Sequence, residues 1–237
     1  MTNRKRGKDR SLDAHARAPR IGQHAAAEPA GSRPKNLHPT LNGHLLFLRG
    51  FLKHPREVAS VVPSSRFVEQ RIIKLAAVRS ATSVVELGPG TGGTTRAILR
   101  AMPKNARLLS FEINPAFHAL LGRIEDPRFA VHLGSAEDLR EVLARYGMPA
   151  PQAIISGIPF STMSRAVAGR VLAAITEVLP AGGRFVAYQV RDDVNRLTRP
   201  YLGPARVEVE LLNIPPLRIF QWEKNGASVA TPRSSRR

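Results

Sequence analysis

The stretch of residues 83–95, Ser-Val-Val-Glu-Leu-Gly-Pro-Gly-Thr-Gly-Gly-Thr-Thr, restricts the possible folds of this chain more than any other. Its first part, residues 83–87, is a short apolar run of the kind that forms a buried parallel strand. Four glycines follow, at positions 88, 90, 92 and 93, so the backbone can turn tightly and let a ligand come close. A helical pattern begins at Thr94, and the free N–H groups of its first turn would face that ligand. Strand, glycine loop (residues 88–93) and helix together predict a nucleotide-type binding site.

Downstream of this stretch, apolar strand patterns alternate with helical patterns, as a parallel sheet requires. Strands are expected at residues 107–111, 129–133, 153–155 and 184–189, and helices at 115–124, 136–145, 165–179 and 191–202. The last two strands, 207–212 and 218–222, are joined by a segment too short for a crossover helix, so they must be antiparallel neighbours. The expected fold is therefore α/β: a mostly parallel, Rossmann-like sheet of seven strands with a C-terminal antiparallel hairpin and helices on both faces.

The composition divides the chain into segments. Residues 1–40 carry nine Lys or Arg, several prolines and few large apolar side chains, so we expect a disordered basic arm. Residues 41–78 are expected to form N-terminal helices, residues 79–224 the main domain, and residues 225–237 a basic tail.

The charge balance predicts the kind of partner. The chain has 36 basic and 18 acidic residues, a net charge of +18, which favours an anionic surface, either nucleic acid or acidic lipid headgroups. No cysteine is present, so disulfides and thiolate metal sites are excluded, and no metal is expected. The apolar runs are too short to span a bilayer and no signal-peptide pattern follows the basic start, so we expect a cytoplasmic protein. The oligomeric state is left open.

Residues 41–54 form a helical pattern with one broad apolar face flanked by basic side chains. Such a helix is expected to lie in a membrane interface, with aromatic side chains at the acyl boundary and basic ones at the phosphates. The alternative is an ordinary helix packed on the domain. A second helix is expected at residues 66–78, with Ser64 or Ser65 as its N-cap. The residues expected to face the membrane or a lipid substrate are Phe47, Arg49, Phe51, Lys53, Ser64 and Ser65.

The spacing Gly88-x-Gly90-x-x-Gly93 also fits a dinucleotide site, so the identity of the cofactor depends on neighbouring residues. Glu86 precedes the first glycine by two residues, where a carboxylate can hold the ammonium group of S-adenosylmethionine. A buried, unpaired carboxylate is costly, so we expect a cation beside it, with an arginine as the alternative partner. Glu112 ends the second strand, where an acid accepts hydrogen bonds from ribose hydroxyls. These features favour S-adenosylmethionine, held by Glu86, Gly88, Gly90, Thr91, Gly92 and Glu112.

Residues 86–92 resemble motif I of class I methyltransferases, and Phe111-Glu112-Ile113-Asn114 resembles motif II. Within that superfamily, residues 45–222 are similar to bacterial phospholipid N-methyltransferases of the phosphatidylethanolamine type. The segments that carry this similarity are Phe51-Leu52-Lys53-His54-Pro55, Pro63-Ser64-Ser65, the glycine loop and Ser156-Gly157-Ile158-Pro159-Phe160. The resemblance implies a peripheral membrane enzyme that methylates the ethanolamine amine towards phosphatidylcholine, with Ile113 and Ser156 as further cofactor contacts.

The sequence departs from that pattern at two places. Where such enzymes often have an Asp that accepts from the adenine, this chain has Ser135, followed by Ala136 and Glu137, and we expect the adenine contacts there. The fifth strand ends in Ala187-Tyr188-Gln189-Val190, unlike the best-known members. This second departure leaves the headgroup open between ethanolamine and ornithine lipids.

The Pro-Phe loop (residues 156–160) follows the fourth strand, which lies beside the first strand in such a sheet. Methyl transfer is an in-line displacement, so the enzyme mainly has to position a neutral amine opposite the sulfur. We expect the carbonyl of Gly157 or Ile158 to accept from the amine, and Phe160, after Pro159, to shelter it and face the developing ammonium. The alternative for Pro159-Phe160 is a turn with a core aromatic.

No general base stands out in the sequence. His118 and His132 are isolated and are interpreted as helix-surface or strand residues. Asp192-Asp193 is interpreted as a helix start.

The leading hypothesis is a peripheral lipid N-methyltransferase. Its rival is a methyltransferase of adenine amino groups in rRNA or another nucleic acid, which also suits a Pro-Phe loop and a basic surface. A target base needs an aromatic stacking platform, and the chain has one Trp, three Tyr and no Asn-Pro-Pro-Tyr at this loop, so nucleic acid is the less favoured partner. A module that binds S-adenosylmethionine without catalysis, or an oxidoreductase, is the remaining alternative.

Overall fold

The computed structural model describes residues 66–211 and 216–225. The basic arm, the pattern at residues 41–54 with Phe47, Arg49, Phe51 and Lys53, and the serines at 64 and 65 lie outside these ranges. The predictions made for them, and for most of the C-terminal tail, therefore stay predictions.

The described residues form a seven-stranded sheet in the order β3-β2-β1-β4-β5-β7-β6. Strands β1 to β5 run parallel, while β7 is antiparallel to both of its neighbours, β5 and β6. The predicted fold class, with its terminal antiparallel hairpin, is confirmed. The strands are β1 (Ser83–Leu87), β2 (Arg107–Glu112), β3 (Phe129–Leu133), β4 (Ala153–Ser156), β5 (Arg184–Gln189), β6 (Arg206–Glu210) and β7 (Leu217–Glu223).

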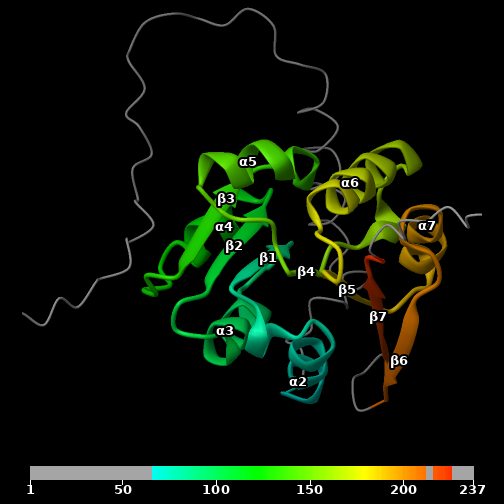
Figure 1. Cartoon of the computed structure of the whole chain (residues 1–237), viewed down its shortest axis with the longest axis horizontal. Coiled ribbons are helices and arrows are strands. Elements are labelled where there is room, and N and C mark those ends of the chain that lie inside the picture. The colour runs from blue at the N-terminus through cyan, green and yellow to red at the C-terminus, as the bar shows by residue number, and fades with distance from the viewer. Residues whose placement is uncertain (1–65, 212–215, 226–237) are drawn as a thin grey trace, which may run out of the picture.

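Helices cover both faces of the sheet (Figure 1). One face packs against α2 and α3, and the opposite face against α5, α6 and α7, while α4 contacts β2 and β3. The helices are α2 (Arg66–Leu75), α3 (Gly93–Ala101), α4 (Pro115–Leu121), α5 (Leu139–Arg145), α6 (Arg165–Val178) and α7 (Asp193–Leu202), with short 3-10 turns η2 (Val78–Ser80), η3 (Ala136–Asp138) and η4 (Phe160–Thr162).

All five helices predicted at 66–78, 115–124, 136–145, 165–179 and 191–202 are shorter than expected, the last two by only one and two residues. The helix predicted at 66–78 ends at Leu75, because Ala77 adopts a left-handed conformation with φ 51° that no helix can continue through. The helix predicted at 136–145 opens as a 3-10 turn capped by Ser135, and that predicted at 115–124 ends at Leu121. These differences lie at helix ends, where apolar periodicity is least informative.

Two apolar clusters form the core, one on each face of the sheet. Strand residues alternate between them: Val84 and Val186 pack against α2 and α3, whereas Val85 and Ala187 pack against α5 to α7. Consecutive residues of one strand therefore reach opposite faces.

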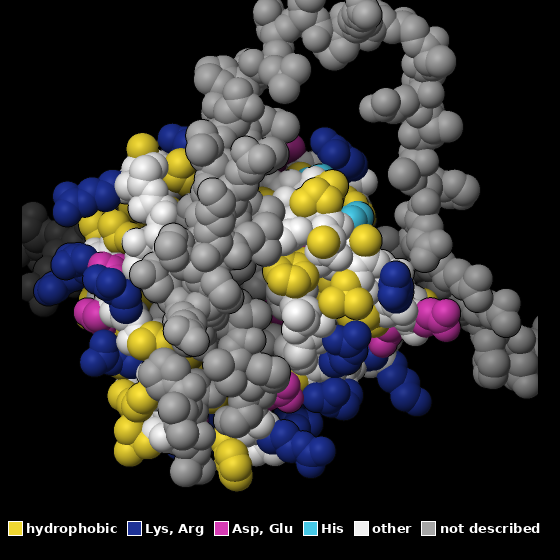
Figure 2. All heavy atoms as spheres, turned by 180° about the vertical axis from the view of Figure 1, so that it is seen from behind, with side chains coloured by type: hydrophobic (Ala, Val, Ile, Leu, Met, Phe, Trp, Pro, Cys, Tyr) yellow, Lys and Arg dark blue, Asp and Glu magenta, His cyan; other side chains and the backbone are white. Residues whose placement is uncertain are grey.

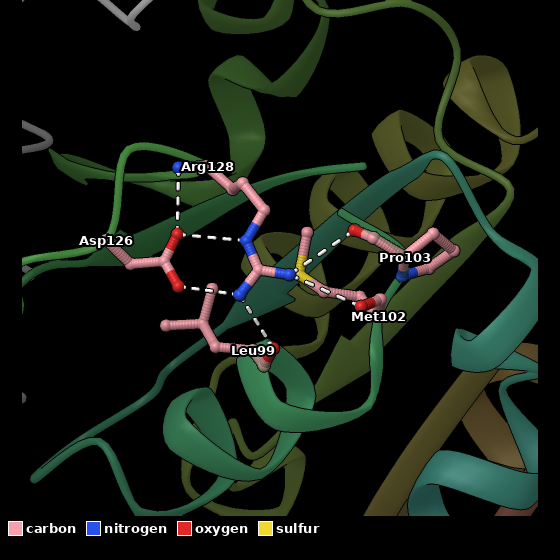
Figure 3. Close-up of polar contacts among 5 residues, drawn as sticks. All are labelled: Leu99, Met102, Pro103, Asp126 and Arg128. Atoms are coloured by element: carbon pink, nitrogen blue, oxygen red, sulfur yellow. Dashed lines mark hydrogen bonds and ion pairs between the residues drawn. The ribbon is translucent and has the colours of Figure 1, made fainter. Parts of the chain in front are cut away.

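Arg128 closes the C-terminal end of α3 (Figure 3). Its guanidinium donates to the carbonyls of Leu99 at 2.8 Å, Met102 at 3.2 Å and Pro103 at 3.3 Å. The same group pairs with Asp126, with Nη2 2.6 Å from Oδ2, and this contact holds the pKa of Asp126 below its ordinary value. A helix end leaves carbonyls without intrahelical donors, and one side chain here satisfies several of them.

Replacing this side chain should destabilise the fold. We expect Arg128→Leu to lower the free energy of unfolding by about 3 kcal/mol, because partly buried carbonyls and Asp126 lose their donor. Urea unfolding measures the change. Arg140→Leu is the matched control, since Arg140 forms exposed pairs with Glu141 and Glu177 and should change stability by less than about 1 kcal/mol. Equal effects of the two substitutions would contradict the capping role.

Candidate functional site

The site is built at the carboxyl edge of the parallel strands, where β1 meets β4. The strand order reverses beside β1, since β2 lies on one side of it and β4 on the other. Leu87 at the end of β1 is in register with Ser156 at the end of β4. Open α/β sheets bind ligands at such a reversal, outside the carboxyl ends of the strands.

The glycine loop and the Pro-Phe loop leave this edge in direct contact. The N–H of Gly88 donates to the carbonyl of Phe111 and that of Gly157 to the carbonyl of Leu87, both at 2.9 Å. A Cβ placed on Gly88 would lie 3.1 Å from Cγ1 of Ile158, and one on Gly157 would lie 2.9 Å from the carbonyl oxygen of Gly88. The two predicted segments therefore form one site.

Three residues of the glycine loop need the conformational freedom of glycine. Gly88, Gly90 and Gly92 have φ values of 69°, 56° and 83°. Among the described residues, no atom beyond its chain neighbours lies within 4 Å of a Cβ placed on Gly90, so this part of the structure leaves the loop open on that side. Arg96 donates to the carbonyls of Thr91 and Gly92 at 3.0 Å and holds the loop onto α3. The open backbone at Gly90 is where a ligand can approach closely.

Glu86 is completely buried beneath the start of α3. Its Oε2 accepts from the hydroxyls of Thr95 and Ser110, both at 2.7 Å, while Oε1 has no hydrogen-bond partner among the described residues. Burial raises the pKa of Glu86 to about 7, although the two hydroxyls oppose this shift. The alternative prediction, in which an arginine pairs with Glu86, is therefore wrong for the described residues. An orphaned carboxylate oxygen beside the loop fits the ammonium group of S-adenosylmethionine.

Glu112 binds the glycine loop from the end of β2. Its Oε2 accepts from the N–H of Gly90 at 3.1 Å, and its Oε1 from the N–H of Asn114 at 2.8 Å. Burial raises the pKa of Glu112, opposed by backbone N–H groups. The four lone pairs of the carboxylate outnumber its backbone donors, so Glu112 can still accept from a ribose next to the half-buried Ile113.

The residues predicted to contact adenine have partners within the protein. Ser135 caps η3 by accepting from the N–H of Glu137, and Glu137 forms an ion pair with Arg170 of α6. Ala136 is buried in the core. The carboxylate of Glu137 is thus held by Arg170 on α6, which leaves the half-buried Ser135 as the more available of the three.

Phe160 is placed differently from the prediction. Its side chain is 1% exposed and belongs to the core cluster under α6 and α7, so the expected role of sheltering the amine and facing an ammonium is wrong for this structure. The alternative, a turn with a core aromatic, is what the structure shows. Gly157, Ile158 and Pro159 are half-buried at the loop surface, whereas the buried Ser156 uses its hydroxyl to accept from the N–H of Ile158 at 3.3 Å.

Two residues at the end of β5 reach this loop and were not assigned a role from the sequence. Gln189 donates from Nε2 to the carbonyl of Ile158 at 2.6 Å. The hydroxyl of Tyr188 lies 3.2 Å from that of Thr94 and beside Gly157. The one sequence feature that pointed to Tyr188 and Gln189 was the ending of the fifth strand, which differs from that of the best-known phospholipid N-methyltransferases.

Comparisons with solved structures identify the fold. N-methyltransferase NodS from Bradyrhizobium japonicum superposes with a TM-score of 0.56 at 11% identity, over 70% of this chain and 99% of that one. O-methyltransferase TomG from Streptomyces achromogenes, solved in complex with S-adenosylmethionine, superposes with a TM-score of 0.55 at 16% identity, over 68% of this chain and 81% of that one. The chain has the class I methyltransferase fold. S-adenosylmethionine, the predicted cofactor, is thus the ligand bound to TomG, and NodS is also solved with S-adenosyl-L-homocysteine.

Sequence comparison gives relatives of two kinds, and no family model matches the chain. An ornithine lipid N-methyltransferase from Singulisphaera acidiphila is 28% identical over 174 residues, which cover 72% of this chain and 91% of that enzyme. Ribosomal RNA small subunit methyltransferase A from Phenylobacterium zucineum is 32% identical over 96 residues, which cover 40% of this chain and only about a third (32%) of that enzyme. The longer match is thus to a lipid N-methyltransferase.

Proposed function

We propose that this chain is an S-adenosylmethionine-dependent N-methyltransferase that acts on the primary amine of a membrane-lipid headgroup, either ornithine lipid or phosphatidylethanolamine. The observation that carries the methyl-transfer part is the contact between the glycine loop and the Pro-Phe loop. Through this contact, a cofactor held over Gly90 lies next to an acceptor held at Gly157 and Ile158.

The chemistry needs positioning more than it needs a titratable side chain. S-adenosylmethionine, when bound, supplies a methyl group on a positively charged sulfur. Glu86 and Glu112 are the residues that would hold its ammonium and ribose groups. Gly157 and Ile158 present backbone carbonyls that can orient the N–H bonds of a neutral amine. A lipid amine has a lysine-like pKa, so we expect turnover to rise with pH as the neutral amine becomes more abundant.

The choice of a lipid acceptor is supported by the longer of the two sequence matches and by the surface. The relative that matches over 91% of its own length is the ornithine lipid N-methyltransferase. Figure 2 shows basic and apolar side chains next to one another on the left and on the right of one face. Basic and apolar groups side by side suit an anionic bilayer surface. We propose peripheral association with such a surface. No described helix has the length and apolar character needed to cross a membrane.

The second candidate is an adenine N-methyltransferase of rRNA, which is supported by the shorter sequence match. An extruded base is usually stacked on an aromatic side chain at the site. Phe160, the aromatic residue of the Pro-Phe loop, is buried in the core and is not available for stacking without rearrangement. This burial favours the lipid acceptor.

A transfer assay with the full chain separates the candidates. Labelled S-adenosylmethionine is mixed with phosphatidylglycerol vesicles that contain ornithine lipid, phosphatidylethanolamine or neither, and in parallel with total rRNA. We expect label in one or both amine lipids and none in the carrier lipid alone. The rate should fall as salt rises, because exposed basic side chains are screened. Label in RNA and in neither amine lipid would overturn the proposal.

A further inference from the structure

Tyr188 and Gln189 are consecutive residues at the carboxyl end of β5, and they reach the Pro-Phe loop from opposite faces of the sheet. Tyr188 packs with the cluster of α2 and α3, as Val186 does, and Gln189 follows Ala187 towards the other face. No residue of the Pro-Phe loop is close to them in sequence. The contacts arise because β4 and β5 are paired in register, with Ser156 opposite Ala187.

Gln189 fixes the carbonyl of Ile158. Its side chain is buried, 5% exposed, and its Nε2 donates to that carbonyl at 2.6 Å. A carbonyl oxygen has two lone pairs, so the bond from Gln189 orients the group and leaves one lone pair for an acceptor amine. A side chain that cannot donate would leave this carbonyl free to rotate.

Tyr188 fixes the other side of the loop. Its hydroxyl is hydrogen-bonded to Thr94 on α3, at 3.2 Å, so it is tied to the helix that follows the glycine loop. A Cβ on Gly157 would lie 2.6 Å from the same hydroxyl, which shows how closely the tyrosine is packed against the loop backbone. Burial raises the pKa of Tyr188, so the hydroxyl stays neutral at physiological pH. Tyr188 thus sets the spacing between α3 and the Pro-Phe loop.

We infer that Tyr188 and Gln189 are positioning residues for methyl transfer, which together place the carbonyls of Gly157 and Ile158 relative to the glycine loop. The inference rests on the proposed methyltransferase function and extends that function by naming the residues that orient the acceptor nitrogen. Neither residue needs to touch the cofactor for this role.

The test separates turnover from cofactor binding. We expect Gln189→Leu to lower kcat about 30-fold and Tyr188→Phe about 5-fold, while the dissociation constant for S-adenosyl-L-homocysteine, measured by calorimetry, stays within about twofold. Gln152→Leu is the matched control: Gln152 accepts from Thr82 and Ser83 at the opposite edge of the sheet, so its loss should lower the melting temperature and leave kcat unchanged.

Gln189→Glu tests the pH dependence of kcat, which should not change if Gln189 has only a structural role. A protonated glutamate can donate to the carbonyl of Ile158, whereas a carboxylate repels it, so the ratio of its kcat to that of the wild type should fall as pH rises. The inference would be overturned if this ratio did not change with pH, or if the kcat of Gln189→Leu were within twofold of the wild type. It would also be overturned if Gln189→Leu lost S-adenosyl-L-homocysteine affinity by the same factor as kcat. If the wild type methylates RNA only, the lipid proposal fails, and the same ratios are then measured with RNA as acceptor.

Discussion

Glu86→Gln is expected to weaken S-adenosylmethionine binding by about 100-fold and to make the free protein more stable at neutral pH. Glu86 is the buried carboxylate whose Oε1 has no donor among the described residues, so it is positioned to pair with the ammonium group of the cofactor. Gln has the same shape and can still accept from Thr95 and Ser110, but it brings no charge. Calorimetric titration with S-adenosylmethionine measures the loss.

The sign of the stability effect follows from the pKa of Glu86. Its pKa rises from the ordinary value of 4.5 to about 7 on folding, so the folded state binds the proton more tightly than the unfolded state. The stability that protonated Glu86 contributes is therefore fully present below pH 4.5 and is lost as pH rises through about 7. The free energy of unfolding falls by about 3 kcal/mol in total over this window. Gln does not titrate, so the melting temperature of Glu86→Gln should exceed that of the wild type by a growing margin as pH rises from 4.5 to about 7.

Cofactor binding should show the same linkage in the opposite sense. The ammonium group pairs with the carboxylate form, so binding near pH 6 should release a proton, and affinity should increase towards pH 8 by up to about 10-fold. Glu177→Gln, on the exposed side of α6, is the control for the substitution itself. Near-normal affinity of Glu86→Gln, or wild-type affinity that does not depend on pH, would show that Glu86 does not bind the ammonium group.

Gly157→Ala is expected to reduce kcat by about 100-fold or more, because its methyl group has no space between the two loops. The added Cβ would lie 2.6 Å from the hydroxyl of Tyr188 and 2.9 Å from the carbonyl oxygen of Gly88, both closer than real Cβ contacts allow. The N–H of Gly88 is tied to the carbonyl of Phe111 on β2 at 2.9 Å, so a shift of the Gly88 backbone would cost this hydrogen bond. The Pro-Phe loop must shift instead, and the acceptor carbonyls shift with it. Initial-rate assays with the preferred acceptor measure the loss.

Gly169→Ala is the matched control for this prediction. Gly169 lies inside α6, and an added Cβ there would meet the hydroxyl at the far end of the exposed Tyr201 side chain, at 3.3 Å. Alanine favours a helix interior, so this variant should keep its activity and gain a little stability. Circular dichroism and melting of Gly157→Ala separate a misplaced loop from a failure to fold. Undiminished turnover of a folded Gly157→Ala would contradict the loop contact on which the proposed function rests.

The elements and the backbone of the site were predictable from the sequence. Alternating apolar patterns predicted every described strand, and the short segment before residue 218 predicted the antiparallel hairpin. Positive φ values at Gly88, Gly90 and Gly92 follow from glycine chemistry, and Glu112 lies where the end of a second parallel strand must bring it. Apolar periodicity and backbone conformation depend mainly on residues close to one another in the sequence, so one sequence is enough to infer them.

The tertiary structure decided which side chains meet. Only the packing of α3 and β2 against β1 shows that Glu86 is held by two hydroxyls instead of an arginine. The sequence left Phe160 open between the site and the core, and the fold buries it. Gln189 is bonded to Ile158 across 31 residues, a contact that depends on the pairing of β4 with β5. Sequence spacing sets the face of a strand on which a residue lies, whereas its partner there is set by strand order and packing.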